Sequence, residues 1–134
     1  MKKLGFTLIE VLIIVLILSI ITIVAMVTQR GITDRAIFST AKSNLAILQR
    51  QIWLYRTAEG NYPETLDKLV TKGYINRVPL LNIKYHTPSD EVVVSTEPHS
   101  MLYDLGKWCY NPATGIISIA CTHKDHEGKQ ICNW

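Results

Sequence analysis

The chain has 134 residues, enough for one small domain, with 14 Lys and Arg against 11 Asp and Glu and a net charge of +3. Hydrophobic residues make up 48% of it and charged residues 19%. These values exclude a multidomain enzyme, a polytopic transporter and a disordered protein. The charge balance is also too small to indicate a nucleic-acid-binding protein.

The first element in chain order is an apolar segment, residues 6–27, in which Glu10 is the only ionisable side chain. As a helix this segment rises about 33 Å, enough to cross a hydrocarbon core of about 30 Å. Lys2 and Lys3 precede it, which places the N-terminus in the cytoplasm and the bulk of the chain outside. A secretory signal would have a shorter apolar run and a clearer small-residue cleavage site.

Glu10 distinguishes this segment from a plain membrane anchor. A carboxylate one turn inside a spanning helix costs about 2–3 kcal/mol on insertion scales, so a cationic partner is expected. A free amine on Phe6 would supply one on the same helix face, provided that the chain is cut between Gly5 and Phe6. The alternative is an acid that is tolerated near the membrane interface.

The leader KKLG (residues 2–5), followed by FTLIE (residues 6–10) and a long apolar run, resembles the signal of type IV prepilins and type II secretion pseudopilins. The resemblance implies that a membrane-embedded prepilin peptidase cuts after Gly5 and methylates the new N-terminal Phe6. It also implies that Glu10 pairs with the N-terminal amine of a neighbouring subunit during filament assembly. Residues 1–5 are then a leader peptide, and residues 6–27 form the membrane-spanning and filament-core half of a helix.

The helical pattern continues beyond the apolar segment. Apolar residues recur every three or four positions from Phe38 to Tyr55, with polar residues between them. The turn-forming cluster Glu59 to Pro63 ends the pattern, so a single helix is predicted from about Phe6 to Ala58. Its amphipathic half, residues 28–59, is expected to pack on a globular head formed by residues 60–134. A coiled-coil seam is disfavoured, because the stripe is shorter than three heptads.

The head is predicted to contain a short helix followed by strands. The segment from Glu64 to Lys72 has its acids early and a lysine late, and Gly73 follows as a C-cap. Segments bounded by turn residues are predicted strands: Ile83–His86, Glu91–Ser95, Lys107–Tyr110 and Gly115–Ala120. Short turns between them favour a small antiparallel sheet packed on the amphipathic half of the helix. The expected class is α+β, and residues 59–75 and 108–115 also resemble pilin segments, so the expected fold is pilin-like.

Three cysteines are present, and in an exported head an odd number leaves one thiol unpaired. The preferred disulfide joins Cys121 to Cys132, since it would close a polar loop that has no core of its own and contribute about 3 kcal/mol. Resemblance to type IV pilins also suggests a C-terminal disulfide loop. If residues 111–115 form a tight hairpin turn, Cys109 faces about Ile117 and not Cys121, so the pairing of Cys109 with Cys121 is the weaker alternative. With Cys121 and Cys132 paired, Cys109 is expected to be a buried, inert thiol between aromatic residues.

Candidate metal and catalytic residues form no convincing set. His123 and His126 have the spacing of a metal site on a helix, but their polar surroundings favour a solvated loop. Three acids lack the spacing of a calcium loop: Asp90, Glu91 and Asp104. No nucleophile, zinc or nucleotide motif occurs, and a hydrolase built on neighbouring polar residues has little support: His99, Ser100 and Asp104. No catalytic residue, metal or cofactor is expected.

The resemblance implies a structural subunit of a type IV pilus filament rather than an enzyme. The expected partners are other copies of the chain in a helical homopolymer, prepilin peptidase, an inner-membrane assembly platform and, before assembly, the membrane. The precursor is expected in the inner membrane with its head outside, and the assembled filament at the cell surface. A major-type pseudopilin of a type II secretion system and a DNA-uptake pilus subunit are alternatives. A signal-anchored binding protein that never polymerises is the alternative from a different class.

Overall fold

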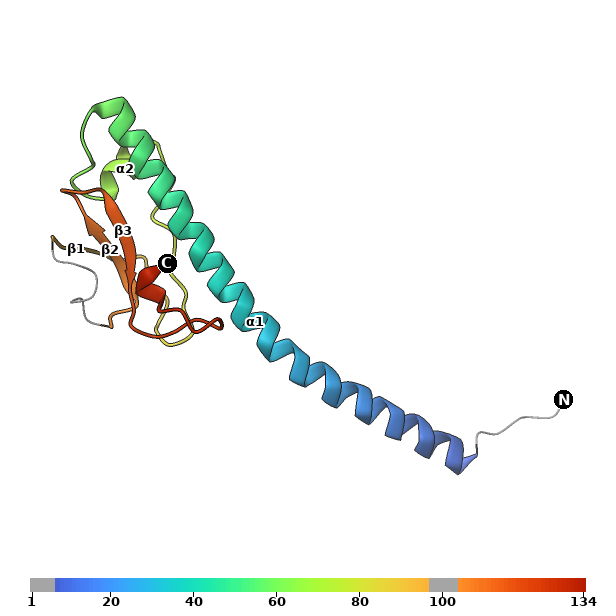
Figure 1. The fold of residues 1–134 in the computed structure, drawn as a ribbon. Helices are drawn as coiled ribbons and strands as arrows, with labels where there is room; N and C mark the ends of the chain where they lie inside the picture. The colour runs from blue at the N-terminus through green and yellow to red at the C-terminus, as the bar shows by residue number, and fades with distance from the viewer. Residues whose placement is uncertain (1–6, 97–103) are drawn as a thin grey trace. The chain divides into compact units, whose positions relative to one another are not determined.

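The computed structural model describes residues 7–96 and 104–134 and divides into two compact units, Met1–Asp34 and Arg35–Trp134. Figure 1 shows helix α1 (Leu8–Glu59), which contributes its first part to one unit and its second part to the other. The second unit adds helix α2 (Asp67–Thr71), three strands and a short 3-10 helix, η2 (Ile131–Asn133). A long helix with a small sheet confirms the predicted α+β class.

The first unit consists of the start of α1. Thr7 precedes the helix, and its carbonyl accepts the first backbone hydrogen bonds, from Glu10 and Val11. Every described side chain from Thr7 to Met26 is exposed, although nearly all are apolar. The hydroxyls of Ser19 and Thr22 donate to helix carbonyls four residues earlier, each at 2.7 Å, so these polar groups are satisfied inside the helix.

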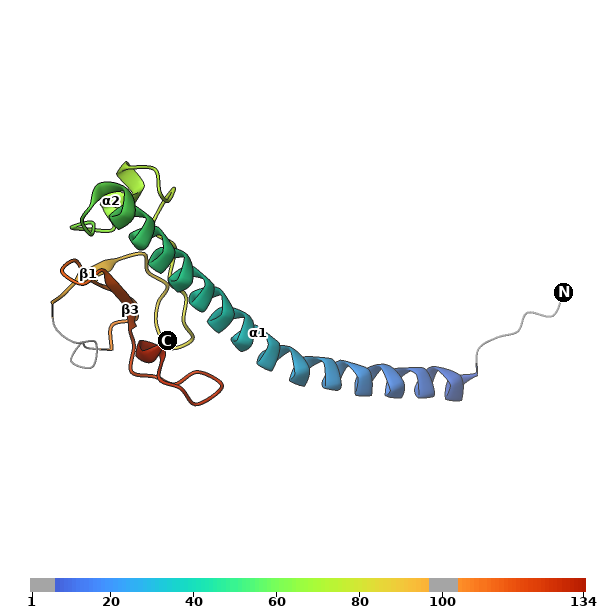
Figure 2. The same ribbon diagram turned by 45° about the horizontal axis from the view of Figure 1, so that its top comes forward.

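The second unit is built on the amphipathic part of α1. The predicted apolar stripe is confirmed, since five of its residues are buried at spacings of three and four: Phe38, Ala41, Leu45, Leu48 and Ile52. They join one core cluster with apolar side chains of α2, the following loop, the sheet and η2. In Figures 1 and 2, α2 and the strands lie along this part of α1.

Helix α2 ends where the sequence predicts, in a Schellman motif. The amide of Gly73 donates to the carbonyl of Val70 at 3.0 Å, and the amide of Tyr74 donates to that of Leu69 at 2.8 Å. Gly73 has a φ of +78°, the left-handed conformation that this cap requires. Leu69 is fully buried, so the short helix is fixed to the core by packing.

The sheet has the order β1-β2-β3, with β1 at Val92–Val94, β2 at Lys107–Asn111 and β3 at Ile116–Ala120. Strands β2 and β3 pair antiparallel, as predicted, but β1 pairs parallel to β2, so the sheet is mixed and not wholly antiparallel. The twelve positions between Val94 and Lys107 explain the difference, because a parallel connection requires about that length of chain.

The predicted strand Ile83–His86 is wrong. An isolated bridge between Leu81 and Ser89 closes this segment into a loop, inside which the amide of His86 donates to the carbonyl of Ile83 at 3.1 Å. Ile83 is buried, so the apolar signal was correct, but the chain turns back after one inward-facing residue.

The β2–β3 hairpin turn is longer by one residue than the turn assumed from the sequence. Asn111 pairs with Ile116, so Cys109 lies opposite Ser118 and not opposite Ile117. The Asn111 carboxamide oxygen accepts hydrogen bonds from two turn amides, at 2.9 and 3.3 Å, and so stabilises the turn. Cys109 is buried, as expected.

Candidate functional site

The apolar surface of α1 is the first candidate site. Leu8–Met26 is a helix of 19 residues that is long and apolar enough to cross a membrane, judged by length and composition alone. None of it is buried inside the protein. Such a surface is stable only against lipid or against other apolar helices.

Glu10 lies at the start of this surface and completes the N-terminal cap of the helix. One of its carboxylate oxygens, Oε2, accepts hydrogen bonds from the amide of Thr7 at 2.8 Å and from the Thr7 hydroxyl at 2.7 Å. The spacing of Thr7 and Glu10 is that of a capping box, a signal that the sequence contains and that sequence reasoning missed. Gly5 and Phe6 lie outside the described residues, so the predicted cleavage, methylation and pairing of the Phe6 amine with Glu10 stay predictions.

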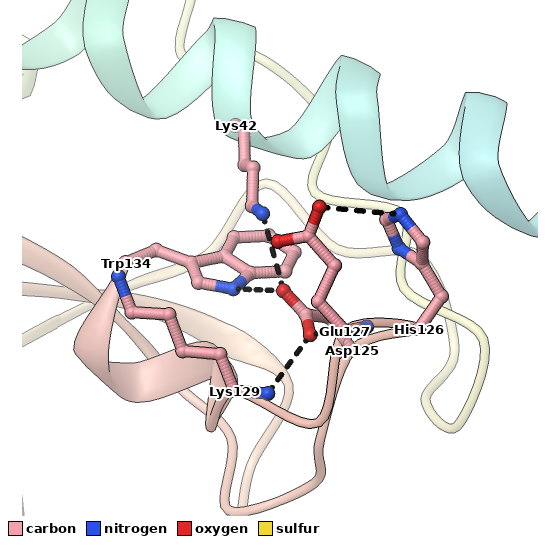
Figure 3. A network of polar contacts seen from close by, with 6 residues as sticks. All are labelled: Lys42, Asp125, His126, Glu127, Lys129 and Trp134. Carbon is pink, nitrogen blue, oxygen red and sulfur yellow. Dashed lines mark hydrogen bonds and ion pairs between the residues drawn. The ribbon is translucent and has the colours of Figure 1, made fainter.

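A buried carboxylate in the head is the second feature, shown in Figure 3. The side chain of Asp125 is completely buried and forms an ion pair with Lys42 of α1, with 3.1 Å between Oδ2 and Nζ. The Trp134 indole nitrogen donates to the same oxygen at 3.0 Å, while the amides of Glu127 and Lys129 donate to Oδ1 at 2.9 and 3.0 Å. Four donors therefore converge on one carboxylate.

An aromatic ring packs on the Trp134 indole that donates to this carboxylate. Phe38 of α1 stacks on His126, with 6.0 Å between ring centroids, and meets Trp134 edge to face at 5.8 Å. The Lys42 ammonium lies 4.6 Å from the centroid of the Trp134 ring, at cation–π distance. Burial raises the pKa of Asp125, but the hydrogen bonds from Lys42, from the two amides and from Trp134 outweigh it and lower the pKa to about 2.

A second polar cluster joins residues that are far apart in the sequence. We call it the four-ligand cluster, and its members are His86, Asp104, Cys121 and His123. One potential ligand atom from each residue lies within 4.8 Å of the others. Burial is the largest influence on the Cys121 thiol and raises its pKa to about 11. The thiol is therefore protonated at neutral pH unless a cation binds it.

The structure separates the two histidines that the sequence grouped together. His123 stacks on Tyr85 with 4.3 Å between ring centroids and belongs to the four-ligand cluster, whereas His126 stacks on Phe38. Asp104 also joins this cluster, while His99 and Ser100 lie outside the described residues. Glu91 forms an ion pair with Lys107 of β2.

All three cysteines are free thiols in the structure. Cys121 and Cys132 are neighbours, because the amide of Cys132 donates to the carbonyl of Cys121 at 3.1 Å. The disulfide between them stays a prediction. Cys109 lies elsewhere, inside strand β2, where burial raises the pKa of its thiol.

Comparison with known proteins agrees with the N-terminal signal. A family model described as the prokaryotic N-terminal methylation motif matches residues 1–26. Competence protein ComGC of Halalkalibacterium halodurans is 30% identical over 93 residues, which is 69% of this chain and 91% of that protein. No solved structure matches the chain. The chain therefore belongs to the type IV pilin-like proteins that carry this methylation motif, as a subunit of the pilin or pseudopilin type.

Proposed function

We propose that this chain is the precursor of a structural subunit of a type IV filament. In this proposal prepilin peptidase removes residues 1–5 and methylates Phe6, and the processed subunit polymerises with identical copies through α1. The observation that carries the proposal is the exposed apolar surface of Leu8–Met26. Lipid covers that surface in the precursor, and identical helices cover it in the filament.

Glu10 is suited to guide this assembly. Both hydrogen bonds from Thr7 end on Oε2, and a carboxylate has about four acceptor positions in total. Among the described residues both of these contacts use Oε2, so the other oxygen could accept a cation from outside this helix turn. An N-terminal amine of a neighbouring subunit would supply that cation and remove the cost of an unpaired charge in an apolar core.

Among such filaments, we propose one that serves competence, the uptake of DNA by the cell. The name of the relative from Halalkalibacterium halodurans supports this choice. A type II secretion pseudopilus is the alternative with the same N-terminal signal. Neither proposal requires the head itself to bind DNA.

The test combines intact-mass spectrometry with a transformation assay in native cells. We expect the fraction sheared from the cell surface to contain a chain that starts at Phe6 and carries one added methyl group. We also expect deletion of the gene to abolish transformation. A sheared chain with normal transformation would indicate another surface pilus, and a processed chain confined to the membrane would indicate a pseudopilin. Retention of Met1 to Gly5 would refute processing.

A matched pair of variants tests assembly. Glu10→Ala is expected to remove the chain from the sheared fraction while the monomer remains in the membrane. Glu59→Ala is the control, because that acid lies at the far end of α1 and its ion pair with Lys72 is exposed to solvent. Normal filaments in the Glu10→Ala strain would contradict the role of Glu10 and favour an anchored protein that does not polymerise.

A further inference from the structure

We propose that the four-ligand cluster is a structural zinc site in the head of this protein. This inference goes beyond the filament proposal and does not depend on it. The cluster combines two imidazoles, one thiol and one carboxylate, each of which is an established zinc ligand. Calcium and magnesium take oxygen ligands and would not select this set.

The sulfur–nitrogen distances fit two edges of a tetrahedral zinc site. The Cys121 sulfur lies 3.4 Å from Nε2 of His86 and 3.6 Å from Nδ1 of His123. The Asp104 carboxylate lies 3.1 Å from each of the same two nitrogens, through Oδ1 and Oδ2. At usual zinc–ligand bond lengths the corners of a tetrahedron lie about 3.3–3.6 Å apart. The two sulfur–nitrogen distances match that figure. The 3.1 Å contacts of Asp104 use a different oxygen for each histidine, and the four ligand atoms lie within 4.8 Å of one another, so the side chains would have to draw together around one carboxylate oxygen to hold the ion.

The surrounding structure holds the ligands in place. The amide of Thr122 donates to Oδ1 of Asp104 at 2.9 Å, and Tyr85 stacks on the ring of His123. Gly106 makes room for His86, because a Cβ added at that glycine would collide with the Cβ of His86. Such supporting contacts orient metal ligands and are typical of metal sites.

Four protein ligands leave no open coordination position, so the expected role is structural and not catalytic. The ion would join three segments: the loop closed by Leu81 and Ser89, the residues before β2, and the residues after β3. Small exported domains commonly need such a staple, because their cores are limited in size. The loop that carries His86 contains no regular strand and would gain the most order.

A disulfide between Cys121 and Cys132 competes directly with zinc. Its formation removes one hydrogen from each thiol and needs an oxidant, and the bonded Cys121 sulfur then has no thiolate to offer to a metal. The two states are therefore mutually exclusive at Cys121. A hydrogen-bonded network without any metal is the other alternative, with Asp104 between the two histidines.

The test uses the full chain in detergent, purified without chelators and kept reduced with a phosphine. Zinc is titrated against a competing chromogenic chelator, and Co²⁺ serves as a spectroscopic probe. We expect one zinc per chain with sub-micromolar affinity, a sulfur-to-cobalt charge-transfer band, and tetrahedral cobalt absorption. Cys121→Ser should abolish the charge-transfer band and weaken zinc binding by more than about 100-fold, beyond the effect of losing a supporting contact.

Matched controls separate the ligands from their neighbours. Cys132→Ser and His126→Ala should bind zinc as the unaltered chain does, whereas His123→Ala should weaken binding as strongly as Cys121→Ser. Tryptophan fluorescence establishes that each variant is folded.

Failure of the unaltered chain to bind zinc would by itself overturn the proposal. An equal loss of zinc affinity in Cys121→Ser and Cys132→Ser would also overturn it. So would a Cys121–Cys132 disulfide in chain isolated unreduced from native cells, detected by a mass two hydrogens lower.

Discussion

Replacing Asp125 with alanine should destabilise the head by about 3 kcal/mol. The substitution removes one partner of a buried ion pair, which costs about 3–5 kcal/mol when the remaining charge stays buried. The Lys42 side chain is 38% exposed and can regain water, so the lower end of that range applies. Three further donors also lose their acceptor: the amides of Glu127 and Lys129 and the Trp134 indole. The loss of unfolding free energy is therefore expected to be no smaller than about 3 kcal/mol. For a unit of about 100 residues, this loss lowers Tm by roughly 12–24 °C.

The assay is urea unfolding of the full chain in detergent, followed by tryptophan fluorescence. Asp125→Asn should cost less than Asp125→Ala, because an amide oxygen still accepts hydrogen bonds from the two backbone amides. Glu127→Ala is the control, since its carboxylate is exposed and its ion pair with His126 is long, at 3.8 Å, and worth less than about 1 kcal/mol. A loss below about 1 kcal/mol for Asp125→Ala would refute the assignment of this carboxylate as a structural anchor.

The same carboxylate predicts a defined pH dependence. Its pKa falls from an ordinary 3.8 to about 2 in the folded protein, so the folded state holds the proton less tightly than the unfolded state. The resulting contribution, about 2 kcal/mol, is complete above the unfolded pKa and is lost as the pH falls through the folded pKa. The stability difference between the unaltered chain and Asp125→Asn should therefore shrink between about pH 4 and about pH 2. A constant difference across that window would show that the four donors do not lower the pKa of Asp125.

Further predictions concern the core, two glycines and the proposed metal. Leu48→Ala should destabilise the head by about 3 kcal/mol in urea unfolding, because Leu48 is fully buried, whereas Ile47→Ala should change it by less than about 1 kcal/mol. Gly115→Ala should lower Tm further than Gly73→Ala does. Both glycines have a positive φ, but only at Gly115 would a Cβ collide with a side chain, the ring of Tyr62. Removal of bound zinc with a chelator should lower Tm, and restoring zinc should reverse the change.

The sequence predicted the elements whose signals are local. The stripe from Phe38 to Ile52 has helical periodicity, so the buried face of α1 could be predicted from the spacing of its apolar residues. Gly73 marks the end of α2, so the end of that helix could be predicted from a local capping signal. The prediction of a strand at Ile83–His86 was wrong. A buried isoleucine beside aromatic residues has the composition of a strand, but composition does not show whether a neighbouring strand is there to pair with it. The parallel pairing of β1 was missed because short strands do not specify their neighbours.

The polar sites could not be predicted for a different reason. Asp125 lies in a polar loop that suggests solvent exposure, and its ion-pair partner Lys42 is 83 positions away. The four-ligand cluster draws on the loop at His86 and on Cys121, which are 35 positions apart. No spacing rule connects such residues, because the tertiary fold alone brings them together. The Thr7–Glu10 cap, by contrast, is a local motif that the sequence could have revealed.

That cap has a consequence for the proposed removal of the leader. Thr7 and Glu10 both lie after the junction between Gly5 and Phe6, so a cut at that junction removes no residue of the cap. Removal of the leader would therefore leave the first turn of α1 with its hydrogen bonds intact. The processed chain would enter assembly with a preformed helix start, while the two basic residues of the leader would be discarded.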